Sequence, residues 1–157
     1  MEHGIEPRLE FAFQIEVKFT SRTKIGLLPS GVRRGFTPTS GGEISGPRLQ
    51  GHVVPDSGGD WASWWPNGVV EFNAQYMLEA SDGTLIVIKN RGFRHAPPEI
   101  LRRMEALEPV DPREYYMRVA PTFEAPVGPH DWLTRTVFVG AADRRADHSI
   151  FRYFAVL

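Results

Sequence analysis

The sequence contains no cysteine among its 157 residues. This absence excludes disulfides, thiolate nucleophiles and thiolate metal ligands, and it fits a reducing compartment. The sequence also lacks any apolar run long enough to span a bilayer. Residues 9–19 alternate between apolar and polar side chains instead of forming the apolar core of a signal peptide. We therefore expect a cytoplasmic protein that makes no contact with a membrane.

An excess of charge of one sign is missing as well. The 18 Lys and Arg residues are balanced by 19 Asp and Glu residues, for a net charge of −1. A dedicated nucleic-acid-binding protein needs a basic field, so we expect no nucleic-acid partner. None of the five histidines lies within four residues of another. This spacing disfavours a local metal site and leaves open only one assembled from distant strands; we expect no metal and no cofactor.

Glycine and proline, in contrast, are abundant. The 15 Gly and 13 Pro residues are spread along the chain and indicate frequent turns rather than a linker. A chain of this length forms one domain by the usual size relation, so residues 1–157 are expected to be a single domain. Frequent turns between short apolar runs favour an all-β architecture.

Alternation of apolar and polar residues predicts the individual strands. Residues 9–19 have their large apolar side chains at odd positions, as in a half-buried strand. Residues 72–80 and 85–88 flank Ser81-Asp82-Gly83, and an Asp-Gly pair favours a hairpin turn. Further strands are predicted at 32–37, 43–45, 48–54, 114–120, 132–140 and 149–156, with a loop at 55–68.

One helix is expected after Pro97 and Pro98, because Ile100, Leu101 and Met104 recur at helical spacing. The strands do not alternate with helices, which argues against a parallel sheet. The predicted fold is an antiparallel β-barrel of about 8–10 strands with one short helix, because closure removes exposed sheet edges. A β-sandwich is the alternative.

Asp60-Trp61 is the most informative dipeptide, because it follows Gly58-Gly59 and precedes Trp64. A carboxyl group against an indole is partly desolvated, which raises its pKa and suits it to general acid or base catalysis. An aspartate after two glycines also caps turns through its side chain, and this second interpretation stays open.

Other candidate site residues depend on which strand face lines a cavity. Tyr116 and Arg118 share one face, which is either the polar wall of a pocket or an outward face with an Arg–Glu pair. His52 is either a surface histidine or a second proton carrier. Asn90, Arg91 and Arg94 end a predicted central strand and are placed either at a pocket mouth or among exposed charges. Trp61, Trp64 and Tyr76 are expected to form walls for a bound substrate.

The chain resembles the family called domain of unknown function 3237 over nearly its whole length. The matching segments are Pro55–Trp61, Asp82-Gly83, Tyr116 with Arg118, Trp132–Thr134 and Phe138–Gly140. The loop before Asp60 has one extra residue, and Thr134 and Arg135 replace an asparagine region. The resemblance implies a small antiparallel β-barrel, cytoplasmic and often oligomeric, but no settled activity.

The leading hypothesis is a cofactor-independent isomerase, lyase or cyclase that moves a proton on a small hydrophobic or aromatic metabolite. Asp60 is the proposed acid or base, with His52, Tyr116 and Arg118 as its catalytic partners. A non-catalytic small-ligand-binding protein is the alternative, and a structural domain with a filled barrel is a third possibility. A homodimer is expected from the general frequency of such assemblies.

Overall fold

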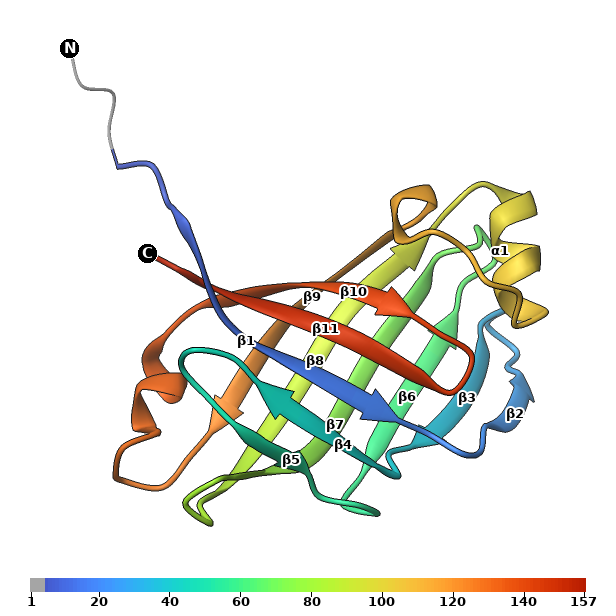
Figure 1. Cartoon of the computed structure of the whole chain (residues 1–157). Coiled ribbons are helices and arrows are strands. Elements are labelled where there is room, and N and C mark those ends of the chain that lie inside the picture. Colours follow the sequence, from blue (N-terminus) through green and yellow to red (C-terminus); the bar gives the residue numbers. More distant parts are fainter. Residues whose placement is uncertain (1–4) are drawn as a thin grey trace.

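The computed structural model describes residues 5–157 and consists mainly of antiparallel β-strands (Figure 1). Eleven strands, one α-helix and two short 3₁₀ helices occur within these residues. The strands are β1 Leu9–Lys18, β2 Thr23–Leu27, β3 Arg33–Pro38, β4 Gly41–Ser45, β5 Gly51–Val53, β6 Gly59–Trp64, β7 Val70–Ala80, β8 Leu85–His95, β9 Tyr116–Glu124, β10 Phe138–Arg144 and β11 His148–Val156. The helix is α1 Pro98–Glu105, and the 3₁₀ helices are Pro112–Glu114 and Asp131–Arg135.

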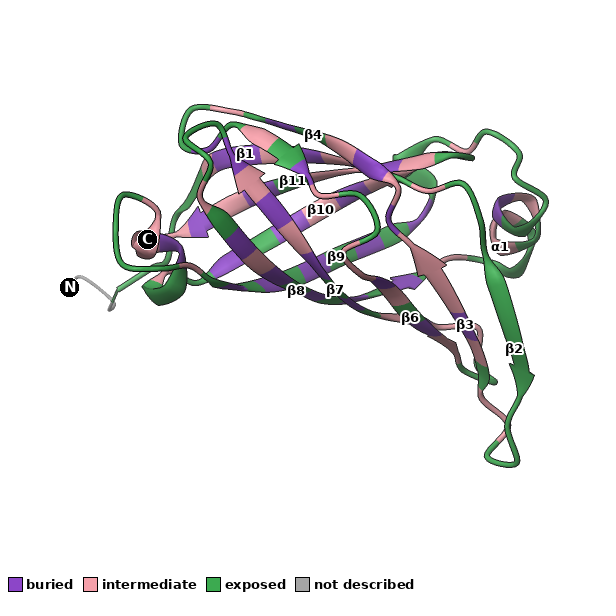
Figure 2. Cartoon of the chain, turned by 90° about the horizontal axis from the view of Figure 1, so that it is seen from below, coloured by how far each residue is buried: buried purple, intermediate pink, exposed green. Residues whose placement is uncertain are grey.

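Eight of the strands close into a barrel, in the order β7-β5-β4-β1-β11-β10-β9-β8, with β8 pairing back onto β7. All their pairings are antiparallel. This confirms the predicted barrel. The remaining strands β6, β3 and β2 extend from the same edge of β7 and form a flap that projects from the barrel (Figure 2).

The sheet branches at β7 because this strand has two partners on one edge. Its last residues pair with β5, and its earlier residues pair with β6. Residues 54–58 fill the gap between the two partners. The Ser57 hydroxyl accepts a hydrogen bond from the Met77 amide at 2.9 Å and donates one to the Val54 carbonyl at 2.7 Å. The sheet therefore opens at one end of the barrel without leaving these β7 groups unpaired.

The closed part of the barrel is filled with apolar and aromatic side chains. Phe13, Phe123, Phe138 and Tyr153 pack with ring centroids 5.2–6.4 Å apart. Leu133, in the second 3₁₀ helix, packs into the same cluster. At the other end of the barrel, α1 inserts Met104 into a smaller cluster with Tyr115 and Met117. The core thus occupies one half of the barrel, and Figure 2 shows buried residues alternating along its strands.

Several predicted boundaries differ from the structure. The segment 55–68, predicted as a loop, contains β6, because the edge of β7 supplies its hydrogen-bond partners. The predicted strand at 132–140 begins only at Phe138, and the one at 114–120 is shifted to Tyr116–Glu124. The short exposed strand β2 was not predicted. The 81–83 turn and the helix after Pro97 are confirmed. No helix in residues 5–157 is long and apolar enough to cross a membrane.

Candidate functional site

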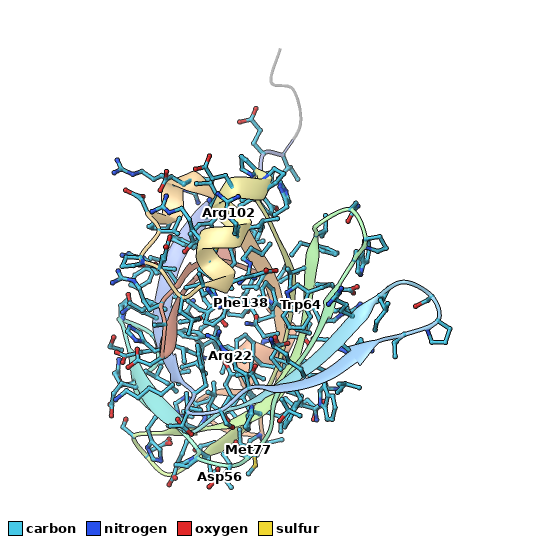
Figure 3. All side chains as sticks on the ribbon, turned by 90° about the vertical axis from the view of Figure 1, so that its right-hand side faces the viewer. Arg22, Asp56, Trp64, Met77, Arg102 and Phe138 are labelled. Carbon is cyan, nitrogen blue, oxygen red and sulfur yellow. The ribbon has the colours of Figure 1, made fainter. Side chains whose placement is uncertain are left out.

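A cavity of about 360 Å³ occupies the end of the barrel that the core leaves open. Its walls come from the flap strands β3 and β6 on one side and from β7, β8 and β11 on the other. Figure 3 looks onto this end, where Arg22 and Trp64 lie among the side chains between α1 and the projecting β2–β3 hairpin. The volume falls in the range of small-molecule sites.

The inward face of β8 shows how the sequence changes from core to cavity. Ile86 and Ile88 are fully buried in the core. Asn90 and Arg94 continue the same face and are buried as well, but they line the cavity. Because side chains alternate along a strand, this apolar-to-polar change marks the level at which the filled half of the barrel ends.

Asp60 enters the cavity from β6. Its Cα lies opposite Ala74 of β7, but the next two residues of β6 have no paired partner on β7. The Asn73 amide instead donates to Asp60 Oδ1 at 2.8 Å. The carboxylate therefore replaces a backbone acceptor in the ladder, which fixes its position while leaving its second oxygen free of any hydrogen bond among the described residues.

Burial raises the pKa of Asp60 to about 6, because desolvation disfavours the charged form. The Asn73 hydrogen bond and the charges of Arg94 and Arg34 oppose this shift without cancelling it. Near neutral pH the group can therefore hold or release a proton, as general acid–base catalysis requires.

Tyr76 lies between the core and the cavity. Its hydroxyl is buried close to the Tyr153 hydroxyl, without a well-formed hydrogen bond to it or to any other described residue. Burial, and then the nearby charge of Asp60, raise the pKa of Tyr76, so the phenol stays protonated and able to donate. Asn90 is similarly buried, and its Oδ1 is also without a partner. Both groups face the same cavity as Asp60.

Two arginines border the cavity nearer to α1. Arg94 is 5% exposed, and its Nε has no acceptor among residues 5–157. Burial lowers the pKa of Arg94 to about 10. Arg144 donates from Nη1 to the Met104 carbonyl at 2.7 Å. Burial, followed by the charges of Arg94 and Arg22, lowers the pKa of Arg144 to about 9.

Of the predicted site residues, the structure places Asp60, Trp64 and Tyr76 around this cavity. Trp61, in contrast, points to the other face of β6. It packs against Phe36 with ring centroids 4.3 Å apart and remains 47% exposed. Adjacent residues of a strand face opposite ways, so Asp60 and Trp61 cannot both face inward here. The predicted indole wall beside Asp60 is wrong.

The other predicted residues lie on the outside of the barrel. His52 pairs with Glu79 at 3.2 Å, and Arg91 pairs with Glu71 at 3.5 Å. Tyr116 stacks on His95 with ring centroids 4.7 Å apart, and Arg118 lies over the Tyr116 ring. Of the two faces considered for Tyr116 and Arg118, the structure shows the outward one. None of these four residues lines the cavity.

Asn90 and Arg94 line the cavity, in agreement with the predicted pocket mouth, but they are buried rather than exposed at its rim. Counting by twos from Ile86 and Ile88 reaches both residues and was the signal that they face inward. Arg144 is the site residue that the sequence prediction missed. No local pattern identified Arg144, because it reaches the cavity from β10 near the Arg144-Arg145 turn to β11. No group of three or more His, Asp or Glu residues within the described chain is arranged to hold a metal ion.

Solved structures resemble this fold over its whole length. A conserved protein of unknown function from Rhodopseudomonas palustris superposes with a TM-score of 0.90 at 32% identity, covering 99% of this chain and all of that one. A β-barrel-like protein from Acinetobacter baumannii has a TM-score of 0.86 at 27% identity and covers both chains fully. An enzyme from Penicillium herquei has a TM-score of 0.73 at 18% identity, covering 100% and 99%, which shows a shared fold alone.

Sequence relatives also match nearly the whole chain. A UPF0311 protein of Rhodopseudomonas palustris is 37% identical over 153 residues, which is 96% of this chain and 99% of that protein. A UPF0311 protein of Clostridium acetobutylicum is 31% identical over 151 residues, covering 96% and 95%. Residues 7–156 match the family described as "Protein of unknown function (DUF3237)". The chain belongs to the DUF3237 family.

Proposed function

We propose that the chain is a cofactor-independent enzyme that transfers a proton on a small hydrophobic or aromatic metabolite. The observation that carries the proposal is the Asp60 carboxyl group, half-buried against a cavity of about 360 Å³ with its pKa raised to about 6. Catalytic acids and bases are tuned by such burial toward the working pH. Isomerase, lyase or cyclase chemistry needs only this group, a shaped cavity and a partner for the oxyanion.

In the proposed reaction, ionised Asp60 removes a proton from a carbon next to a substrate carbonyl. The electron pair of the broken C–H bond forms a C=C bond, and the negative charge moves to the carbonyl oxygen. Tyr76 and Asn90 line the same cavity, and the proposal assigns the Tyr76 O–H and the Asn90 side-chain N–H as the donors that stabilise this oxygen. In a substrate with a further C=C bond conjugated to this enolate, protonated Asp60 then returns the proton to the far carbon of that C=C bond. The double bond shifts towards the carbonyl carbon and the C=O bond re-forms, which completes an isomerisation.

Tyr76 and Asn90 take the role that the sequence prediction gave to Tyr116 and Arg118. Tyr116 and Arg118 lie outside the barrel, so they are not available to an oxyanion in the cavity. His52 also lies outside, and the proposal therefore has a single proton carrier. Arg94 and Arg34 assist indirectly, because their charges hold the pKa of Asp60 below the value that burial alone gives.

A non-catalytic ligand-binding protein is the second candidate. One observation favours it: Asp60 Oδ1 completes the β6–β7 ladder by accepting the Asn73 amide, which is a structural task. In this alternative the cavity binds the same small molecules but returns them unchanged.

The test is hydrogen exchange on candidate substrates. Ligands are selected by thermal shift from small aromatic acids, lactones and enones, because a ligand that binds only the folded state raises Tm. Each is then incubated in D₂O, and deuterium incorporation is followed by NMR. We expect catalysed exchange whose rate rises with pH through about 6 and falls at least ~100-fold in Asp60→Asn.

Asp82→Asn is the matched control. Asp82 sits in the β7–β8 turn away from the cavity, and Asn-Gly is also a favoured hairpin turn. This variant should exchange like the wild type. Ligands that bind but never exchange in the wild type, or exchange at equal rates in Asp60→Asn, would leave the binding protein as the correct function.

A further inference from the structure

Basic residues outnumber acidic ones around the cavity, although the chain as a whole has nearly balanced charge. The protein carries a net charge of −1. The cavity, however, is lined by only two acidic residues, Asp60 and Glu105. Its basic lining residues are Arg22, Lys24, Arg33, Arg34, Arg94 and Arg144. A cleft with this excess concentrates positive potential where a ligand enters.

Three of these arginines, the buried Arg94, the half-buried Arg144 and the exposed Arg22, lack carboxylate partners. No ion pair within 4.0 Å joins an acidic side chain of residues 5–157 to Arg22, Arg94 or Arg144. Arg94 is nine-tenths buried, yet its Nε has no acceptor. A buried donor left without an acceptor costs free energy that an acceptor on a bound ligand would recover.

The charged groups near Arg94 and Arg144 do not provide either arginine with a carboxylate partner. Glu105 attracts both guanidinium groups, and Asp60 attracts Arg94. Burial raises the pKa of Tyr115, so this phenol is neutral near pH 7 and adds no negative charge. Arg22 repels both guanidinium groups. Asp60 is engaged by the Asn73 amide, and the Arg144 donor that is satisfied reaches a backbone carbonyl rather than a carboxylate. The cluster therefore keeps Arg94 Nε as a buried donor that a ligand acceptor can satisfy.

Most of the remaining lining is apolar. Phe72, Met117 and Phe151 contribute rings and a thioether to the cavity wall, and Arg94 lies over the Phe72 ring at 5.7 Å. A ligand that satisfies both parts must carry an acidic group on an apolar or aromatic body. Phosphate alone would leave the apolar wall uncovered, and a neutral aromatic would leave Arg94 unpaired.

We propose that the cavity binds a hydrophobic or aromatic carboxylate, with the carboxylate held by Arg94 and Arg144 and the apolar body against Phe72 and Phe151. This inference names the substrate class of the proposed proton-transfer reaction and rests on that function for its catalytic meaning. Binding itself requires only the cavity and its arginines. A guanidinium fork suits carboxylate geometry better than a point charge does.

The test compares two probes of equal shape, 2-naphthoate and 2-naphthamide, at pH 7.5 by isothermal titration calorimetry. We expect naphthoate to bind at least ~10-fold more tightly, as a charge-assisted hydrogen bond predicts. Arg94→Met should reduce this ratio to within ~2-fold. Arg91→Met is the matched control, because Arg91 lies on the same strand but points outward and pairs with Glu71; it should keep the full ratio.

Equal binding of the two probes by the wild type, no binding of naphthoate, or an unchanged ratio in Arg94→Met would each overturn the proposal. Thermal unfolding of each variant is measured first, and Arg144→Met repeats the comparison if Arg94→Met does not fold. The proposed proton transfer and the proposed carboxylate binding are refuted by different results. Naphthoate preference without exchange of any bound ligand would refute catalysis alone, whereas exchange of neutral enones without carboxylate preference would refute this inference alone.

Discussion

At the scale of single residues, Asp60 shows how one carboxyl group can belong to both the fold and the site. One of its oxygens completes a break in the β6–β7 ladder, and the group is half-buried against the cavity. Desolvation is the largest influence on its pKa, ahead of the amide hydrogen bond and the two arginine charges. The raised pKa of Asp60 was predicted from the wrong neighbour, since Trp61 packs against Phe36 on the other face of β6.

The raised pKa of Asp60 predicts how stability depends on pH. The folded pKa of about 6 exceeds the ordinary value of 3.8, so the folded state binds the proton more tightly than the unfolded state does. The contribution of Asp60 to stability is therefore fully present below about pH 4 and is lost as the pH rises through 6. Asp60→Asn removes this loss, because asparagine stays neutral and can still accept from Asn73.

We accordingly expect Asp60→Asn to be more stable than the wild type by about 2–3 kcal/mol at pH 7.5. The difference should shrink toward zero below about pH 4. Urea unfolding at a series of pH values measures both quantities. A variant that is less stable at pH 7.5 would show that the ionised carboxylate contributes more to the fold than its burial costs.

At the scale of elements, alternation predicted the strands that lie on the closed barrel. In β7 the predicted face Phe72, Ala74, Tyr76 and Leu78 is the inward face. In β1 the alternation holds from Phe13 to Val17, but a register shift between Phe11 and Phe13 leaves Leu9 exposed. A local pattern cannot reveal a bulge whose cause is the register of the neighbouring β11.

Elements that depend on distant partners were harder to predict. Strand β6 has glycine, tryptophan and proline at and around its ends, which suggested a loop. It is a strand because β7 and β3 supply partners on both its edges. The helix α1 was predictable, since Pro98 in the first turn and the spacing of Ile100 and Met104 are local signals.

Gly42 in β4 lies too close to β1 to carry a side chain. A Cβ on Gly42 would lie 1.7 Å from the Glu16 carbonyl oxygen of β1, and the residue has φ +144°. Gly83 has φ +88° but nothing within 4 Å of such a Cβ. Gly42→Ala should lower the free energy of unfolding by more than ~2 kcal/mol, whereas Gly83→Ala should cost about 1 kcal/mol from its backbone angle. Chemical denaturation of both variants checks the order; equal losses would mean that β4 can move away from β1.

At the scale of the whole molecule, the barrel divides into a filled half and an open half. Tyr76, Asn90 and Arg94 mark the level at which the cavity replaces the core. The barrel class was predictable because hairpins and scattered turns identify closed antiparallel sheets. The flap of β2, β3 and β6 was not, although it supplies one wall of the cavity, because branching at β7 depends on pairings between distant segments.

This division predicts different costs for removing similar aromatic side chains. Phe13 is fully buried against Phe123, Phe138 and Tyr153, so Phe13→Ala should lower stability by about 3–5 kcal/mol. Phe72 faces the existing cavity and is only partly buried. Phe72→Ala should cost less than half as much, and it should weaken 2-naphthoate binding. Similar stability losses for both variants, measured in urea, would contradict the division.

Titration of Asp60 tests the proposed function directly, because that function depends on desolvation of this carboxyl group at the cavity. The side-chain carboxyl carbon of ¹³C-labelled protein is followed by NMR between pH 3 and 9, with the resonance assigned by its absence in Asp60→Asn. We predict a midpoint near pH 6. A midpoint near 4, as for a solvent-exposed aspartate, would show that the carboxyl group is hydrated and would contradict its role as the proton carrier.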